Sequence, residues 1–164
     1  MVIGIFSDSH DNIFRIREAV ELFNSWSCQL VIHAGDYIAP FAIREMRKIA
    51  CPVRGVFGNN DGERQGLSQM FKLIGEIKDP PFSLEALKTR ILILHDPAFA
   101  GSLAKSGDYD LVVCGHTHHP EIRREGSCLI VNPGECGGWL TGKATVAKFD
   151  PESGQAEVIE LTGG

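Results

Sequence analysis

The sequence predicts a mixed α/β layered sandwich that forms a single domain over residues 1–164. In the first half of the chain, short apolar runs alternate with longer amphipathic segments, a rhythm typical of βαβ units with parallel strands. In the second half, strands follow one another more closely and turn-forming residues separate them, which indicates β-hairpins. The length is typical of one domain, and no internal repeat, low-complexity tract or linker divides the chain.

The first half is expected to form three parallel strands joined by two helices. The first helix covers residues 13–23, where apolar residues recur on one face and Asn12 stands in the N-cap position. The second helix covers residues 40–49 and begins near Pro40, a residue that the first helical turn tolerates. The three buried strands are expected at residues 2–6, 30–35 and 52–58.

The second half is expected to form mostly strands. One helix is predicted at residues 63–73 and another near residues 98–106. The runs PFSLEAL and TRILILHD, at residues 81–87 and 89–96, predict an antiparallel pair with a short turn. Further strands are expected at residues 110–115, 120–124, 127–131, 143–149 and 155–161.

The composition is that of an ordinary globular protein, with 43% hydrophobic and 23% charged residues. A formal net charge of −5 argues against a broad basic surface for nucleic acid, whose binding depends on Lys and Arg. The apolar run near the N-terminus has only about five residues, too few for a signal peptide or a membrane-spanning helix. The five cysteines form no C-x-x-C pair, and most lie within or beside apolar runs, as buried reduced thiols do. We therefore expect a cytoplasmic protein without a membrane partner.

Five polar clusters each follow an apolar strand, in the order SDSH, GD, GNND, LH and GHTH. In open α/β sheets, ligand sites form beyond the carboxyl ends of the strands, where several loops converge. We therefore expect one functional site from side chains that are far apart in the sequence. These side chains are Asp8, His10, Asp36, Asn59, His95, His116 and His118.

Two carboxylates, one carboxamide and four imidazoles can supply a pair of divalent ions with oxygen and nitrogen ligands. In D-x-H and H-x-H, side chains two positions apart point the same way, so both can reach one centre. Each cluster alone could be a turn, a cap or, for His95, a core histidine. The coincidence of four of six histidines at strand ends favours the metal site. His33 is expected to be packed within its strand. For His119 two alternatives stay open, contact with substrate or exposure to solvent.

The five clusters resemble the ordered motifs of the calcineurin-like metallophosphoesterases, which are D-x-H, G-D, G-N-H-D/E, a lone H and G-H-x-H. Here they read DSH, GD, GNND, LH and GHTH between residues 8 and 118, and NPG at residues 132–134 extends the match. The short chain looks most like the compact YfcE-like phosphodiesterase branch. This resemblance implies a fold of two mixed β-sheets packed together and flanked by helices.

The resemblance implies a dinuclear centre in which Asp36 bridges two divalent transition-metal ions. Four imidazoles disfavour magnesium, and manganese, nickel, iron, zinc and cobalt remain open. The implied ligands are Asp8, His10, Asp36 and His118 for one ion, and Asp36, Asn59, His95 and His116 for the other.

The implied activity is that of a metal-dependent phosphoric ester hydrolase, a phosphodiesterase that cleaves small phosphodiesters by attack of a metal-bridging hydroxide. Two alternatives within the fold are a phosphomonoesterase and a nuclease. A third is a catalytically weak protein-interaction scaffold like a retromer subunit. The oligomeric state is open, with a homodimer as one alternative.

Four further residues near these motifs call for separate expectations. Asn60 stands where the family usually has histidine, so it is expected to donate a hydrogen bond to a phosphoryl oxygen without protonating the leaving group. Asp61 is expected to orient its loop from behind the ligands. Glu135 replaces a common serine and could repel phosphate, pair with a cation or recognise a cationic group. Its neighbour Cys136 is expected to be a buried, inert thiol.

Overall fold

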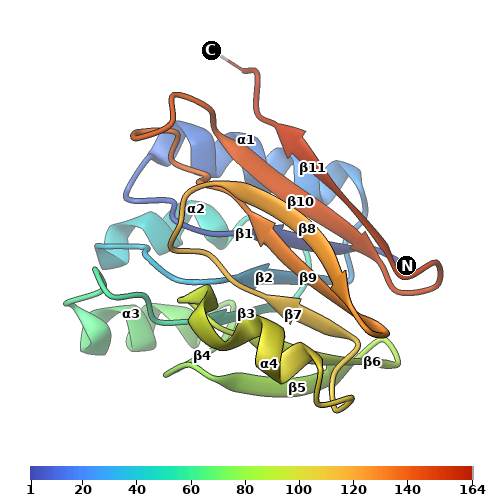
Figure 1. The fold of residues 1–164 in the computed structure, drawn as a ribbon. Coiled ribbons are helices and arrows are strands. Elements are labelled where there is room, and N and C mark those ends of the chain that lie inside the picture. Colours follow the sequence, from blue (N-terminus) through green and yellow to red (C-terminus); the bar gives the residue numbers. More distant parts are fainter. Residues whose placement is uncertain (164) are drawn as a thin grey trace.

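Two β-sheets packed face to face form the centre of the protein, and helices cover their outer faces (Figure 1). The computed structural model describes residues 1–163. Both sheets contain parallel and antiparallel pairs, so the expected sandwich of two mixed sheets flanked by helices is confirmed. No helix within residues 1–163 is long and apolar enough to cross a membrane.

The first sheet joins the βαβ half of the chain to its last hairpin. Strands β1 to β4 are parallel to one another, whereas β10 is antiparallel to both β1 and β11. Strand β4 follows the third helix and was not expected from the sequence. In spatial order the strands are β11 (Gln155–Glu160), β10 (Thr145–Asp150), β1 (Ile3–Phe6), β2 (Leu30–His33), β3 (Val53–Val56) and β4 (Gly75–Lys78).

The second sheet contains three central parallel strands with an antiparallel strand on each side. Strands β6, β7 and β9 are the parallel ones, and the expected antiparallel pair is formed by β5 and β6. In spatial order the strands are β5 (Phe82–Ala86), β6 (Thr89–Ile93), β7 (Leu111–Val113), β9 (Cys128–Pro133) and β8 (Pro120–Glu125).

The helices lie where the sequence predicts them, but the second is much shorter than expected. Asn12 caps α1, because its side chain accepts a hydrogen bond from the Arg15 amide at 3.4 Å. Pro40 begins a 3₁₀ turn that runs into α2. The amide of Arg47 still donates to the carbonyl of Ile43, but those of Lys48 and Ile49 make only tight i to i−3 turns. The helical elements are α1 (Ile13–Ser25), η1 (Pro40–Ala42), α2 (Ile43–Met46), α3 (Arg64–Phe71), η2 (Pro97–Phe99) and α4 (Ala100–Ala104).

Apolar side chains fill three layers of the sandwich. Ile5 and Ile32 of the first sheet pack with Val113 of the second in the layer between the sheets. Phe6 points the other way, towards the layer that α1, α2 and α3 cover. Helix α4 covers the outer face of the second sheet. Central strands are buried on both faces, which explains why they appear in the sequence as continuous apolar runs.

The loops after the parallel strands of both sheets meet at one edge of the sandwich. The amide of Asp8, after β1, donates to the Gly35 carbonyl at 2.9 Å, after β2. In the second sheet, the amide of Gly115 donates to the His95 carbonyl, also at 2.9 Å. The amide of Cys136, after β9, donates to the Ser7 carbonyl at 2.8 Å and links the two sheets. This edge carries the predicted site.

Candidate metal centre

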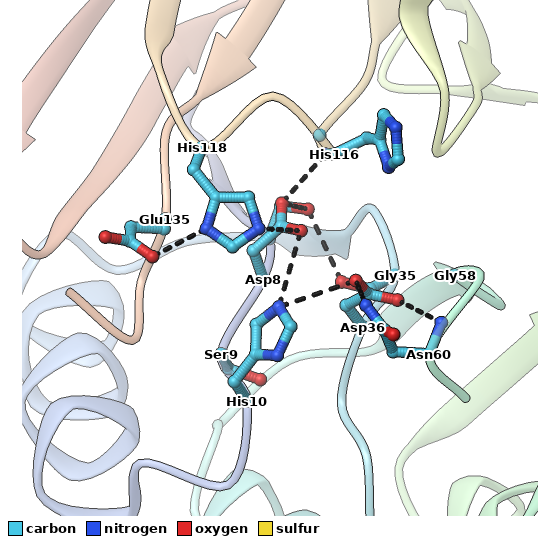
Figure 2. A network of polar contacts seen from close by, with 12 residues as sticks. Asp8, Ser9, His10, Gly35, Asp36, Gly58, Asn60, His116, His118 and Glu135 are labelled. Carbon is cyan, nitrogen blue, oxygen red and sulfur yellow. Dashed lines mark hydrogen bonds and ion pairs between the residues drawn. The ribbon is translucent and has the colours of Figure 1, made fainter. Parts of the chain in front are cut away.

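Four predicted ligand side chains converge at this edge to form a first group. One ligand atom from each of Asp8, His10, Asp36 and His118 lies within 4.8 Å of the others. His10 Nε2 is 3.4 Å from Asp36 Oδ2, and His118 Nε2 is 3.4 Å from Asp8 Oδ1. Figure 2 shows both imidazoles pointing at the carboxylates. The spacing suits a single metal ion.

The other predicted ligands form a second group beside the first. Asn59 Oδ1 lies 2.8 Å from His95 Nε2 and 3.0 Å from His116 Nδ1. His95 Nε2 is 3.6 Å from Asp36 Oδ2, so Asp36 lies between the two groups. Asn59 and His116 are exposed, whereas Asp8 and Asp36 are buried. The second group therefore opens to solvent.

Hydrogen bonds orient two of the histidines with a free lone pair towards the site. His95 Nδ1 lies 2.7 Å from the Ala34 carbonyl, which can only accept, so this nitrogen carries the proton. His118 Nδ1 lies 2.6 Å from the Glu135 carboxylate and carries its proton in the same way. In both rings Nε2 is left as the acceptor that faces the neighbouring ligands.

Two buried polar atoms in the first group have no hydrogen-bond partner among the residues that the structure describes. They are Asp8 Oδ1 and His10 Nε2. The other oxygen of Asp8 accepts from the Ser7 hydroxyl at 2.6 Å and from the His116 amide at 3.0 Å. Buried polar atoms are nearly always paired, so two such atoms facing one another are an unusual feature. The donor set and these atoms fit a divalent transition-metal ion.

Five of the seven predicted ligands lie in the left-handed backbone region, which is uncommon for residues other than glycine. Such strained conformations cluster at functional sites, where the surrounding structure stabilises them. The φ angles are 51° at Asp8, 40° at His10, 63° at Asp36, 70° at His116 and 63° at His118.

Glycines allow the backbone to approach the carboxylates closely. A Cβ atom on Gly58, in GNND, would lie 2.1 Å from Asp36 Oδ1. A Cβ atom on Gly115, in GHTH, would lie 2.6 Å from Asp8 Oδ2. Any larger residue at either position would displace a predicted ligand, which explains why glycine begins both motifs.

Asp61 holds the loops after β2 and β3 together. Its buried carboxylate accepts backbone hydrogen bonds from Asp36 at 2.9 Å, Tyr37 at 2.8 Å, Ile38 at 2.9 Å and Gly58 at 2.7 Å. Burial raises the pKa of Asp61 above its ordinary value, although these hydrogen bonds oppose that shift. The expectation that Asp61 orients its loop from behind the ligands is confirmed.

Asn60 contacts the predicted bridging carboxylate. Its backbone amide donates to Asp36 Oδ1 at 2.9 Å, and its side-chain Nδ2 donates to Asp36 Oδ2 at 2.7 Å. Burial tends to raise the pKa of Asp36, but interactions with His10 and Asn60 outweigh it and hold the pKa well below its ordinary value. The hydrogen bond from Asn60 to a phosphoryl oxygen stays a prediction.

Glu135 contacts the site in a way that sequence reasoning missed. It is fully buried, and one oxygen lies 2.6 Å from His118 Nδ1. Burial tends to raise the pKa of Glu135, but hydrogen bonds from Thr141 and His118 outweigh it and lower the pKa. Like the predicted ligands, Glu135 follows a parallel strand, β9. Its position in the sequence could therefore have indicated that it lies at the site, although its residue type did not indicate its contact with His118.

The remaining candidates have ordinary roles. His33 is buried, with Nε2 2.9 Å from the Ser9 hydroxyl and Nδ1 accepting from the Gly35 amide at 3.1 Å, so neither nitrogen is free. His119 is exposed. Cys136 is buried, and burial raises the pKa of its thiol far above the usual range. The expectations of a packed His33 and a buried, inert Cys136 are confirmed.

Two mixed sheets with an Asp and His cluster at their shared edge define a metallophosphoesterase fold. The sequence model of the calcineurin-like phosphoesterase superfamily domain matches residues 1–154. The chain belongs to this superfamily, as its five motifs predict.

Related proteins match the chain along almost its whole length. It is 40% identical to a protein named phosphodiesterase from Methanocaldococcus jannaschii, over 98% of this chain and 99% of that one. A solved structure described as a novel archaeal phosphodiesterase has a TM-score of 0.93 and 38% identity, covering 98% and 100% of the two chains. YfcE, a phosphoesterase from E. coli, shares the fold with a TM-score of 0.69 and 21% identity, covering 99% and 100%.

Replacing Asp61 with asparagine should destabilise both loops, because an amide group would then face two of the four backbone donors. We expect the free energy of unfolding to fall by roughly 2–6 kcal/mol, since each buried unpaired donor costs about 1–3 kcal/mol. Chemical denaturation followed by circular dichroism measures the change. Asp108→Asn, at an exposed turn, is the matched control and should leave stability unchanged. A similarly small effect of Asp61→Asn would contradict this role.

Metal affinity should depend on pH through His10. Contact with the carboxylates of Asp36 and Asp8 raises the pKa of His10 from 6.5 to about 9 in the metal-free protein. A metal ion must displace this proton, so the apparent affinity should rise by about tenfold per pH unit as pH increases towards 9, and then level off. Zinc titration against a competing chelator measures the profile. His119→Ala should keep it, and a flat profile would count against histidine ligands.

Proposed function

We propose that this protein is a dinuclear-metal-dependent phosphodiesterase that hydrolyses small phosphodiesters. The observation that supports it is the convergence of the seven predicted ligand side chains into two groups, with Asp36 in contact with both. The chain is also 40% identical to a protein named phosphodiesterase, and the two chains match almost completely. A hydrolase of phosphoric esters therefore agrees with the fold, the site and the family.

The site would suit an anionic substrate although the whole chain is acidic. Two divalent ions bound there would activate a shared water and stabilise the attacking and leaving oxygens at phosphorus. Two carboxylates contribute −2 and two such ions +4, which leaves about +2 for the substrate. Asn59 is a neutral ligand and preserves this positive excess. The net charge of −5 does not oppose phosphate binding at the site, but it disfavours a nuclease with a broad basic track.

The protein's own residues would orient the ligands and bind the phosphoryl group. Asn60 holds both oxygens of Asp36, so the bridging carboxylate has a defined direction before substrate binds. The side chain of Asn60 has no titratable proton and therefore cannot protonate a leaving group. Esters whose leaving groups depart without a proton should be the best substrates.

We also propose that residues 1–164 form one metallophosphoesterase domain in the cytoplasm. All strands of residues 1–163 belong to two sheets that share one apolar layer, which supports a single domain. The free state of all five cysteines supports a reducing compartment.

In the presence of manganese or nickel, the protein should hydrolyse bis(p-nitrophenyl) phosphate faster than p-nitrophenyl phosphate or single-stranded DNA. His95→Ala removes a predicted ligand and should lower kcat/KM by more than roughly 100-fold. Release of p-nitrophenol measures the rates for the two p-nitrophenyl esters, and gel electrophoresis measures DNA cleavage. Asp108→Asn is the control that should keep full activity. Absence of turnover with every divalent ion would refute the proposed function.

Asn60→His should restore a group that can protonate the leaving group. We expect hydrolysis of diesters with poor leaving groups to accelerate, by up to roughly 10²-fold, with little change for p-nitrophenyl esters. The slope of log kcat against leaving-group pKa, measured over a series of aryl and alkyl diesters, should become shallower. Asn60→Ala should not change that slope. An equal gain for all leaving groups would mean that the histidine does not act as an acid.

A further inference from the structure

Glu135 is a fully buried carboxylate whose two oxygens face different parts of the site. Oε2 lies 2.6 Å from His118 Nδ1, a contact that Figure 2 shows directly. Oε1 accepts from the Leu140 amide at 2.9 Å, the Thr141 amide at 2.5 Å and the Thr141 hydroxyl at 2.7 Å. The negative charge is therefore compensated entirely by hydrogen-bond donors, as a buried carboxylate requires.

The chemistry of these contacts determines the tautomer of His118. An ionised carboxylate has no proton to donate, so the short contact with Oε2 requires the proton of His118 to be on Nδ1. The lone pair of the ring is then on Nε2, which points at Asp8 Oδ1 from 3.4 Å. Nε2 is therefore the nitrogen of His118 that is free to bind an ion in the first group.

The same carboxylate anchors the loop of residues 137–141, which lies against the other ligands. The Gly137 amide donates to the Asp8 carbonyl at 3.0 Å, and the Trp139 indole donates to the His10 carbonyl at 3.1 Å. Glu135 holds the far end of this loop. It is thus connected, directly or through the loop, to three of the four residues of the first group.

We propose that Glu135 is a positioning residue, which fixes His118 as a metal ligand through Nε2 and holds the 137–141 loop against the backbone of the other ligands. The inference rests on the proposed function only in taking His118 as a ligand. Both oxygens of Glu135 are already in contact with groups of the protein itself. It acts on metal affinity through the imidazole, as carboxylates behind metal-bound histidines do.

Glu135→Gln separates this role from simple packing, because glutamine has nearly the same shape but only one acceptor oxygen. Its carbonyl oxygen should face the three donors of Leu140 and Thr141, because this orientation keeps the larger number of hydrogen bonds. Its amide would then face His118 Nδ1 and would favour the opposite tautomer, with the proton on Nε2. That proton would block the ligand position.

The test combines nitrogen-15 NMR of the histidine side chains at alkaline pH with zinc titration against a competing chelator. In the wild-type, metal-free protein, His118 should carry its proton on Nδ1. In Glu135→Gln the proton should move to Nε2, and zinc affinity should fall by roughly 10- to 100-fold. Thr141→Val, which removes one hydroxyl from Oε1 and leaves His118 untouched, should keep the tautomer and change the affinity less than about twofold.

Several outcomes would overturn the inference. An Nε2 proton on His118 in the wild-type protein would do so without any variant, even if Glu135→Gln does not fold. An unchanged tautomer in Glu135→Gln would reduce Glu135 to a packing role, whatever the affinity does. A changed tautomer with unchanged affinity would show that His118 does not bind through Nε2. Failure of the wild-type protein to bind any metal would instead refute the proposed function, and the tautomer would still report the effect of Glu135.

Discussion

The structure depends on the burial of two carboxylates, Asp8 and Asp36, where the edges of the two sheets meet. Removing an ionised carboxylate from water is costly unless donors or cations surround it. Asn60 supplies two donors to Asp36, while Ser7 and His116 supply two to Asp8. Positive or donor groups must therefore lie close to these oxygens. The close approach of the backbone at the motif glycines, the left-handed backbone of the predicted ligands and the nearby imidazoles all agree with this need.

A second pair of buried carboxylates acts behind the ligands. Asp61 joins the loops after β2 and β3, and Glu135 joins the loops after β7 and β9. In each case both oxygens accept hydrogen bonds, so each carboxylate determines the direction of several groups at once. Candidate ligands held in this way would lose little conformational freedom on binding an ion or a substrate, which would favour affinity and catalysis.

Ligand sites in open α/β sheets form beyond the carboxyl ends of the strands, which explains why so much of the site could be predicted from the sequence. Parallel strands place their carboxyl ends at one edge, so polar residues after β1, β2, β3, β6 and β7 had to meet there. The role of Glu135 depended on the direction of its side chain, which residue type alone does not determine. Strand β4 escaped prediction because GEIK has low strand propensity and pairs only with β3 at the sheet edge.

The candidate ligands belong to both sheets, since Asp8, His10, Asp36 and Asn59 follow strands of the first, while His95, His116 and His118 follow strands of the second. An ion held by Asp8 and His118 would be a cross-link that closes a loop of about 110 residues, and closing so long a loop removes much of the entropy of the unfolded chain. The supply of transition metal in the cell would then govern the lifetime of the protein as well as its turnover. Chains made during metal starvation would be degraded sooner.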